Sequence, residues 1–250
     1  MSELRIGVVG RGRVGTAISE ALRAAGRDVA GPLGRGETPA NVDAVLLCVP
    51  DAEIPAAAAA VGRAASLVGH TSGATRLAAL EPSGARGLFG LHPLQTFTGS
   101  PHDAERFHGC RCAVGGTSDE ALDAALGIAR TLGMEPFELS DEQRPAYHAA
   151  ASIASNFLVA LEAAAEEVAA GAGLDPAEAR AALAPLVRTT VENWAELGPE
   201  RALTGPVARG DDLTVAAQRE AVRATAPQLE ALFDVMVERA QALARQRVPA

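Results

Sequence analysis

The stretch Gly10-Arg11-Gly12-Arg13-Val14-Gly15 decides how the first part of this chain folds. It directly follows the apolar run Ile6-Gly7-Val8-Val9 and opens a segment with helical character. Glycines at this spacing permit a tight turn, a close approach of the backbone to a pyrophosphate, and packing of a helix on a strand. The plain alternative is a turn between strand and helix. The context favours a Rossmann unit that binds a nicotinamide dinucleotide at the helix N-terminus.

The pattern around this loop predicts an α/β domain followed by a helical one. Short apolar runs alternate with helical stretches in the first half, as in βαβ units with a parallel sheet. From about Ser140, Gly and Pro become rarer and a 3.6-residue periodicity takes over. We expect domains at 1–138 and 139–250. The expected strands are 5–9, 27–30, 44–49, 66–70, 87–91 and 111–114. The expected helices are 15–25, 52–64, 76–80, 119–132, 141–170, 175–194 and 213–245, with Asp175 as N-cap before Pro176 and a loop around Pro206 and Gly210.

The end of the second expected strand indicates which dinucleotide binds. NAD sites place an Asp or Glu there to hold the ribose 2′-hydroxyl, whereas an Arg accommodates the 2′-phosphate of NADP. The segment Val29 to Gly36 has no acid at that place and contains Arg35. The sequence therefore favours NADP, while Glu37 keeps NAD open.

Further cofactor contacts are expected where other strands end. Val49, Pro50 and Asp51 end the third strand, and Thr71 and Ser72 follow the fourth. Ligands of open α/β sheets bind at these carboxyl ends. Asp51 and Ser72 can equally serve as helix caps. With Gly10, Gly12, Arg13, Val14, Gly15 and Arg35, these residues form the predicted cofactor site.

Composition excludes several classes of protein. The net charge of −9 and pI near 5.1 disfavour nucleic acid and anionic lipid as partners. The N-terminus has no signal-peptide pattern, and no run reaches the ~18 apolar residues of a membrane helix. Three cysteines make no disulfide framework, and the Cys110-x-Cys112 spacing is not that of a zinc site. We expect a cytoplasmic protein without metal. Long helices that are apolar on more than one side predict a homodimer through the helical domain.

The chain contains no lysine, because all 22 basic residues are arginine. Proton donation to a reduced substrate is therefore assigned to histidine. His148, Ser152 and Asn156 recur at i, i+4 and i+8 on one expected helix and share a face. His92 ends a strand before Pro93, in a place that suits either a ligand contact or a structural turn. Arg209, in the expected loop 204–211, suits a substrate carboxylate, and pairing with Asp211 is the alternative.

Several motifs carry a resemblance to a known family: His70-Thr71-Ser72-Gly73, Leu91 to Phe97, Tyr147 to Ala151, Ser155-Asn156 and Leu203 to Asp211. The N-terminal part resembles coenzyme F420-dependent NADP oxidoreductases and pyrroline-5-carboxylate reductases. The combined motifs look specifically like Rossmann-like proteins with a DUF2520 C-terminal domain. The resemblance implies a helical domain like that of 6-phosphogluconate dehydrogenase, a dimer and an oxidoreductase activity.

Related β-hydroxyacid dehydrogenases and ketopantoate reductases carry a lysine four residues before an asparagine on the matching helix. The asparagine matches Asn156, but the lysine position is Ser152. By this resemblance His148 replaces the lysine as proton donor, and Asn156 holds the substrate carbonyl or carboxylate; the alternative for His148 is a core or helix-surface histidine beside Tyr147. The expected function is NADP-dependent hydride transfer to a small oxo acid or imine at the cleft between the domains. A non-catalytic NAD(P)-binding sensor and an F420-dependent NADP reductase are the alternatives.

Overall fold

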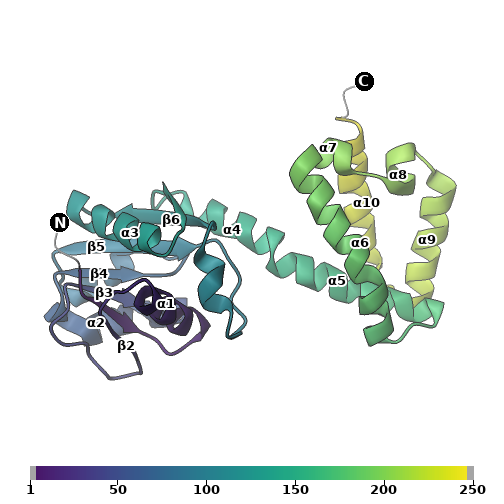
Figure 1. Cartoon of the computed structure of the whole chain (residues 1–250). Coiled ribbons are helices and arrows are strands. Elements are labelled where there is room, and N and C mark those ends of the chain that lie inside the picture. Colours follow the sequence, from purple (N-terminus) through teal and green to yellow (C-terminus); the bar gives the residue numbers. More distant parts are fainter. Residues whose placement is uncertain (1–3, 247–250) are drawn as a thin grey trace. The chain divides into compact units, whose positions relative to one another are not determined.

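The computed structural model describes residues 4–246 (Figure 1). Contacts divide the chain into two compact units, Met1–Ser155 and Asn156–Ala250. This division falls later than the boundary expected after residue 138, because helix α4 (Arg144–Ala154) belongs to the first unit. Each unit is described by itself.

The first unit is built on a seven-stranded sheet of order β2-β1-β3-β4-β5-β6-β7. Strands β1 to β5 are parallel, as expected, but β6 runs antiparallel to β5 and β7 runs parallel to β6. The connection from β5 to β6 contains the 3-10 helix η4 (Asp103–Phe107) and no α-helix of the kind that usually carries a parallel crossover. The strands are β1 (Ile6–Val9), β2 (Val29–Leu33), β3 (Ala44–Leu47), β4 (Leu67–His70), β5 (Gly87–Pro93), β6 (Arg111–Gly116) and β7 (Glu135–Glu138).

Strand β7 was not predicted from the sequence. Its four residues, Glu-Pro-Phe-Glu, include a proline and two acids, a composition that is poor in strands. The strand lies at the edge of the sheet, where proline is tolerated because one row of backbone groups needs no partner. Its position in the sheet, rather than its composition, makes it a strand.

Helices cover both faces of this sheet and close two apolar cores. Alternate residues of the strands point to opposite faces, so that Val8 and Leu46 join one core, and Val9 and Leu47 the other. Helices α1 (Arg13–Ala24) and α3 (Asp119–Thr131) pack on the first face. Helix α2 (Ile54–Val61) and the 3-10 helix η3 (Leu77–Ser83) pack on the second. The 3-10 helices η1 (Asp51–Glu53) and η2 (Gly62–Ala64) flank α2.

The strand order creates a topological switch point beside β1. The chain passes from β1 to β2 on one side and then to β3 on the other. Open α/β sheets bind ligands at the carboxyl ends of the strands at such a point. The glycine-rich loop follows β1 and the segment Cys48 to Asp51 follows β3. The fold therefore brings both predicted cofactor segments to the same edge.

The second unit is helical. Helix α6 begins as predicted, with Asp175 accepting hydrogen bonds from the N–H groups of Ala177 and Glu178 in a capping box and Pro176 at the first position. The elements are α5 (Asn156–Ala169), η5 (Ala170–Ala172), α6 (Pro176–Leu197), α7 (Pro199–Ala202), α8 (Gly205–Arg209), α9 (Asp212–Thr225), η6 (Pro227–Leu229) and α10 (Glu230–Ala244).

Two expected long helices are interrupted in the structure. The expected helix 213–245 is divided into α9 and α10, because Pro227 forces Ala226 out of the helical region, at φ −143° and ψ 69°. The expected helix 141–170 begins only at Arg144 and is broken at Ser155, with φ −122° and ψ −70°. The expected loop 204–211 contains the short helix α8, which the sequence analysis missed.

An open apolar cavity of about 750 Å³ lies within the second unit, lined by residues of α5, α6, α9, η6 and α10. Within the stretch Arg144–Ala172, an 18-residue window has a mean hydropathy of 1.2, high enough by length and composition to cross a membrane. This corrects the expectation that no segment is long and apolar enough. It is weak evidence for a membrane span, because helices of soluble bundles pass the same test.

Candidate active site

Two cavities open beside the glycine-rich loop. The first, of about 540 Å³, is lined by Gly12, Arg13, Val14, Cys48, Val49, Pro50, Asp51, Thr71, Ser72, Gln95 and Phe97. The second, of about 530 Å³, is lined by residues 9–12, 34–37 and 48–50, together with Glu53 and part of α2. They share Gly12, Cys48, Val49 and Pro50. Except for Gly15, every residue predicted to bind the cofactor lines one cavity or the other.

Glycine suits the three loop positions 10, 12 and 15 for different reasons. Gly10 has φ +119°, and a Cβ there would overlap the backbone of Cys48. A Cβ at Gly15 would overlap the carbonyl oxygen of Gly10, so glycine lets α1 pack against the loop. At Gly12 a Cβ would meet no atom within 4 Å. Packing within the protein does not require glycine at that position, whereas close approach of a ligand would.

Charged side chains surround the second cavity and are paired with one another. Arg35 donates to both carboxylate oxygens of Glu53 at 2.8 Å, and its side chain is 85% exposed. Arg11 donates to Glu37 at 2.8 and 3.1 Å and to the carbonyl of Pro32 at 3.3 Å. The sequence analysis assigned Arg35 and Glu37 to this region but not Arg11. Arg11 stands at a variable position of the glycine motif, where the pattern itself gives no signal.

Asp51 and Ser72 form a hydrogen bond across the ends of two strands. The Ser72 hydroxyl donates to an Asp51 carboxylate oxygen at 2.8 Å. The same hydroxyl accepts the N–H groups of Ala74 and Thr75 at 3.2 and 2.9 Å. Asp51 makes no helix-capping bond. Ser72 therefore organises the turn after β4, and its partner lines the first cavity.

Three ring side chains gather next to this turn. The phenol of Tyr147 lies 2.8 Å from Nδ1 of His92, and the ring centroids of His92 and His148 are 5.9 Å apart. A Cβ at Gly73 would lie 2.8 Å from the His148 ring and 2.9 Å from Nε2 of His92. Only glycine at position 73 leaves room for both imidazoles. The structure thus brings together His92 and His148, both predicted site residues, and adds Tyr147 and Gly73.

Burial sets the protonation of the site. The pKa of His92 is lowered to about 4, first by burial and then by His148 and Arg144. The pKa of Tyr147 is raised to about 12, mainly by burial. At neutral pH His92 is therefore neutral and the phenol keeps its proton. The phenol can donate to Nδ1, and His92 then carries its own proton on Nε2, beside Gly73.

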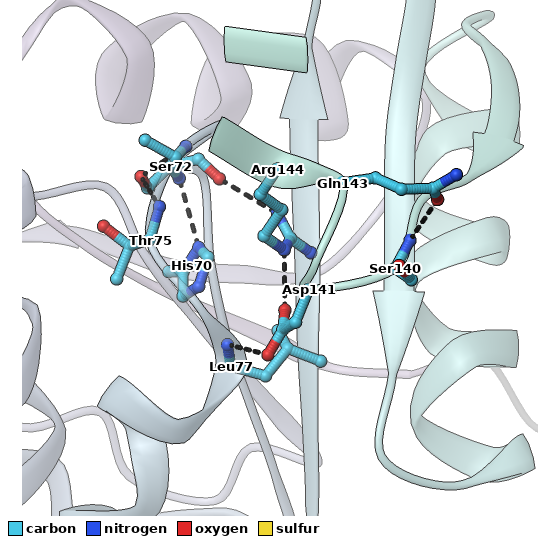
Figure 2. Close-up of polar contacts among 9 residues, drawn as sticks. His70, Ser72, Thr75, Leu77, Ser140, Asp141, Gln143 and Arg144 are labelled. Atoms are coloured by element: carbon cyan, nitrogen blue, oxygen red, sulfur yellow. Dashed lines mark hydrogen bonds and ion pairs between the residues drawn. The ribbon is translucent and has the colours of Figure 1, made fainter. Parts of the chain in front are cut away.

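A buried ion pair supports the turn after β4 (Figure 2). The Arg144 side chain is fully buried, and its Nε donates to Asp141 at 2.8 Å. Its Nη1 donates to the carbonyl of Ser72 at 3.4 Å, and the N–H of Ser72 donates to Nδ1 of His70 at 3.2 Å. The other Asp141 oxygen accepts the N–H of Leu77 at 2.9 Å. Burial and the nearby Arg144 charge lower the pKa of His70 to about 4.

Sequence reasoning missed Arg144, Asp141 and Tyr147. The available signal was spacing, because residues 144, 147 and 148 recur at i, i+3 and i+4 and share a face of α4. This face carries an arginine, a tyrosine and a histidine in a helix that is otherwise mostly alanine. Gly90 lies opposite this face, and only glycine there leaves room for the Arg144 guanidinium, which a Cβ would overlap.

The remaining predicted site residues are in the second half of α4 and in the second unit. Ser152 is on α4, one turn after His148. Asn156 is exposed and begins α5, so the break at Ser155 interrupts the expected i, i+4, i+8 face. Arg209 is exposed and is the last residue of α8, which corrects its placement in a loop. Asn156 and Arg209 both belong to the second unit.

The sheet order, the glycine-rich loop and the helical second unit define a Rossmann-type α/β fold with a helical C-terminal part. The chain belongs to the DUF2520 family, described as a domain of unknown function, which matches residues 110–240, more than half of its length. The family assignment and the fold class expected from the sequence are thus confirmed. None of the curated protein sequences matches the chain.

Solved structures share this fold over almost the whole chain. A Bacteroides fragilis protein named "putative NADP oxidoreductase" is 20% identical, with a TM-score of 0.80 over 96% of this chain and 98% of its own. A Thermotoga maritima protein is 24% identical, with a TM-score of 0.76 over 96% and 98%. The Plasmodium falciparum pyrroline carboxylate reductase with NADP bound is 11% identical, with a TM-score of 0.59 over 98% and 99%. At these identities the likeness shows the fold.

Proposed function

We propose that this protein is an NADP-dependent oxidoreductase that transfers a hydride to a small oxo acid or imine. One observation carries the proposal. The cavity beside the glycine-rich loop is lined by Thr71 and Ser72, and the next residue, Gly73, packs against His92 and His148. A dinucleotide pocket and a pair of proton-bearing rings are thus joined by one short turn. The names of similar structures, which include an NADP-bound pyrroline carboxylate reductase, support the same class of reaction.

The residues present fit a dinucleotide. The open space at Gly12 admits a pyrophosphate against the backbone, and α1 begins there without a side-chain cap, which leaves its N-terminus to an anion. We infer that Gly10, Gly12, Arg13, Val14 and Gly15 hold the phosphates. We assign Val49, Pro50 and Asp51 to the floor of the pocket and Arg35 to its 2′-phosphate end.

The bound nicotinamide supplies the hydride, and the protein orients the acceptor and manages the proton. In our proposal His148 donates the proton that the reduced oxygen or nitrogen requires. Neutral His92 offers its Nε2–H as a hydrogen bond to the same acceptor atom, with its tautomer held by Tyr147. Thr71 and Ser72 contact cofactor or substrate. We assign substrate binding to Ser152, Asn156 and Arg209 from their chemistry alone.

We further propose that the protein is a homodimer through its helical unit and resides in the cytoplasm. Large apolar side chains are exposed on this unit, with Leu186 at 63% and Trp194 at 56% of their full exposure. Exposed apolar surface of this extent is typical of a protein–protein contact. The two residues lie eight positions apart on α6 and so share one face.

The test is nucleotide binding by calorimetry, followed by NADPH oxidation with a panel of 2-oxo acids and cyclic imines. We expect NADPH to bind and at least one compound to be reduced. In His148→Gln, kcat should fall about 100-fold with little change in NADPH affinity, since general acid catalysis typically contributes 10²- to 10⁴-fold. His102→Gln, on a side chain 75% exposed, is the matched control. Binding without turnover of any compound would favour a sensor, and no binding would refute the proposal.

A further inference from the structure

Arg11 makes a bridge between two loops at the cofactor edge of the sheet. It belongs to the glycine-rich loop after β1, yet its guanidinium bonds the end of β2 and the loop that follows β2. Nε donates to the carbonyl of Pro32 at 3.3 Å, and Nη2 donates to Glu37 at 2.8 Å. A Cβ at Gly34 would lie 3.3 Å from Nη1. Arg11, Gly34 and Glu37 all line the second cavity.

Glu37 is held in place as well. One of its carboxylate oxygens accepts the N–H of Gly34 at 2.5 Å in addition to the bond from Arg11. An arginine and a carboxylate therefore face the same small volume after β2. This is where Rossmann proteins read the ribose of the adenosine, with an acid for a 2′-hydroxyl and an arginine for a 2′-phosphate. The chain presents both groups at once, and they are bonded to each other.

We propose that Arg11 selects NADP by exchanging Glu37 for the 2′-phosphate of the cofactor, and that Glu37 opposes this choice. The inference rests on the proposed function. Breaking the Arg11–Glu37 pair costs little free energy, because exposed ion pairs contribute little to stability. The Arg11 side chain is 63% exposed and the Glu37 side chain 47%. The bond from Nε to Pro32 keeps the guanidinium in position, so that Nη1 and Nη2 can form the two-pronged contact that phosphate favours.

Glu37 acts in two ways in this arrangement. With NADP it is a negative charge next to the incoming phosphate, which weakens binding. With NAD its Oε1, which accepts only the longer bond from Arg11 at 3.1 Å, can accept the ribose 2′-hydroxyl, as acids at this position do. The preference between the two cofactors is therefore a balance of Arg11 against Glu37, and each residue should shift it in the opposite direction.

Arg35 is a weaker candidate for the same contact. Within residues 4–246 both of its bonds go to Glu53 and no main-chain acceptor anchors it, and its side chain is 85% exposed. Binding a phosphate through Arg35 would require a mobile side chain to be ordered as well as a bidentate pair to be broken. The inference therefore gives the principal contact to Arg11 and a secondary one to Arg35.

The test measures Kd for NADPH and NADH by calorimetry in the wild type and in Arg11→Gln, Glu37→Gln, Arg35→Gln and Arg13→Gln. Arg11→Gln should weaken NADPH binding about 10- to 100-fold, as expected for a lost charge-assisted hydrogen bond, and NADH binding less than about twofold. Glu37→Gln should strengthen NADPH and weaken NADH binding, each about threefold. Arg13 lines the other cavity, so Arg13→Gln should affect both nucleotides equally.

The outcomes separate this inference from the proposed function. If the wild type binds neither nucleotide, the proposed function fails. If it binds NADPH and Arg11→Gln changes both affinities by the same factor, or neither, the proposed function stands and the inference is wrong. A larger NADPH loss in Arg35→Gln than in Arg11→Gln would likewise overturn it. Circular dichroism melts should coincide for all variants, because every substituted side chain is exposed.

Discussion

The two units of this chain differ in how completely they cover their own apolar surface. In the first, both faces of the sheet are closed by helices, and strands such as β1 and β3 are buried throughout. In the second, large apolar residues remain exposed, among them Val159 at 70% and Leu213 at 86%. The sheet unit therefore satisfies its own packing, whereas the helical unit offers surface for a further contact.

The largest effect is expected in the buried centre of the first unit. Arg144→Ala leaves a cavity where a fully buried side chain stood and leaves the Asp141 carboxylate, which is 26% exposed, without its cation, so we expect a loss of about 3–5 kcal/mol of unfolding free energy. The matched pair in the helical unit is Arg180–Glu166, whose arginine is 69% exposed. Arg180→Ala should cost less than about 1 kcal/mol. Urea unfolding followed by circular dichroism measures the loss of unfolding free energy in each variant. Equal losses would contradict the proposed difference between the two units.

The glycine-rich loop should be almost as sensitive. Gly10→Ala combines a positive φ with a clash against the Cys48 backbone, so we expect a loss of about 3 kcal/mol and of nucleotide binding. Gly36 also has positive φ, at +80°, but a Cβ there meets nothing within 4 Å. Gly36→Ala should therefore cost only the conformational strain, about 1–2 kcal/mol. Thermal melts that rank these variants the other way would show that the loop is not tightly packed.

Stability should also depend on pH through His70. Its pKa is about 4 in the folded state and 6.5 as the ordinary value, so the unfolded chain binds more protons between these values. The contribution of His70 to the free energy of unfolding is therefore fully present above pH 6.5. It is lost as the pH falls toward 4, by up to roughly 3 kcal/mol. In His70→Asn the loss over this window should be smaller than in the wild type. His102→Asn, on an exposed histidine, should not change the slope.

Substitutions on the exposed face of α6 should have the smallest effect on folding but a clear effect on dimer formation. Trp194→Gln with Leu186→Gln should change monomer stability by less than about 0.5 kcal/mol, because both side chains are largely exposed. The double variant should raise the dimer dissociation constant at least tenfold, measured by analytical ultracentrifugation. Leu94→Gln, on an exposed leucine of the first unit, is the control. A monomeric wild type would remove the proposed role of this face.

The sequence was a good guide where local rules decide the structure. The glycine spacing, the apolar strands β1, β3 and β4, and the Asp175-Pro176 helix start follow from short-range sterics and hydrogen bonding. It was a poor guide where neighbours decide. Strand β7 exists because β6 pairs with it, and the Arg144 pair is buried because α4 packs on the sheet beside Gly90.

The Rossmann loop and the helical second half could be predicted from consecutive residues, because a glycine turn and a 3.6-residue periodicity are local patterns. Which polar side chains meet depends on the packing of elements that are distant in the sequence. His92 comes from β5, Tyr147 and His148 from α4, and Gly73 from the turn after β4. Their contact depends on how strands and helix are stacked, and no spacing along the chain encodes that distance. The pairing of Arg11 with Glu37 could not be predicted from the sequence for the same reason. Their loops meet only because β1 and β2 are neighbours in the sheet.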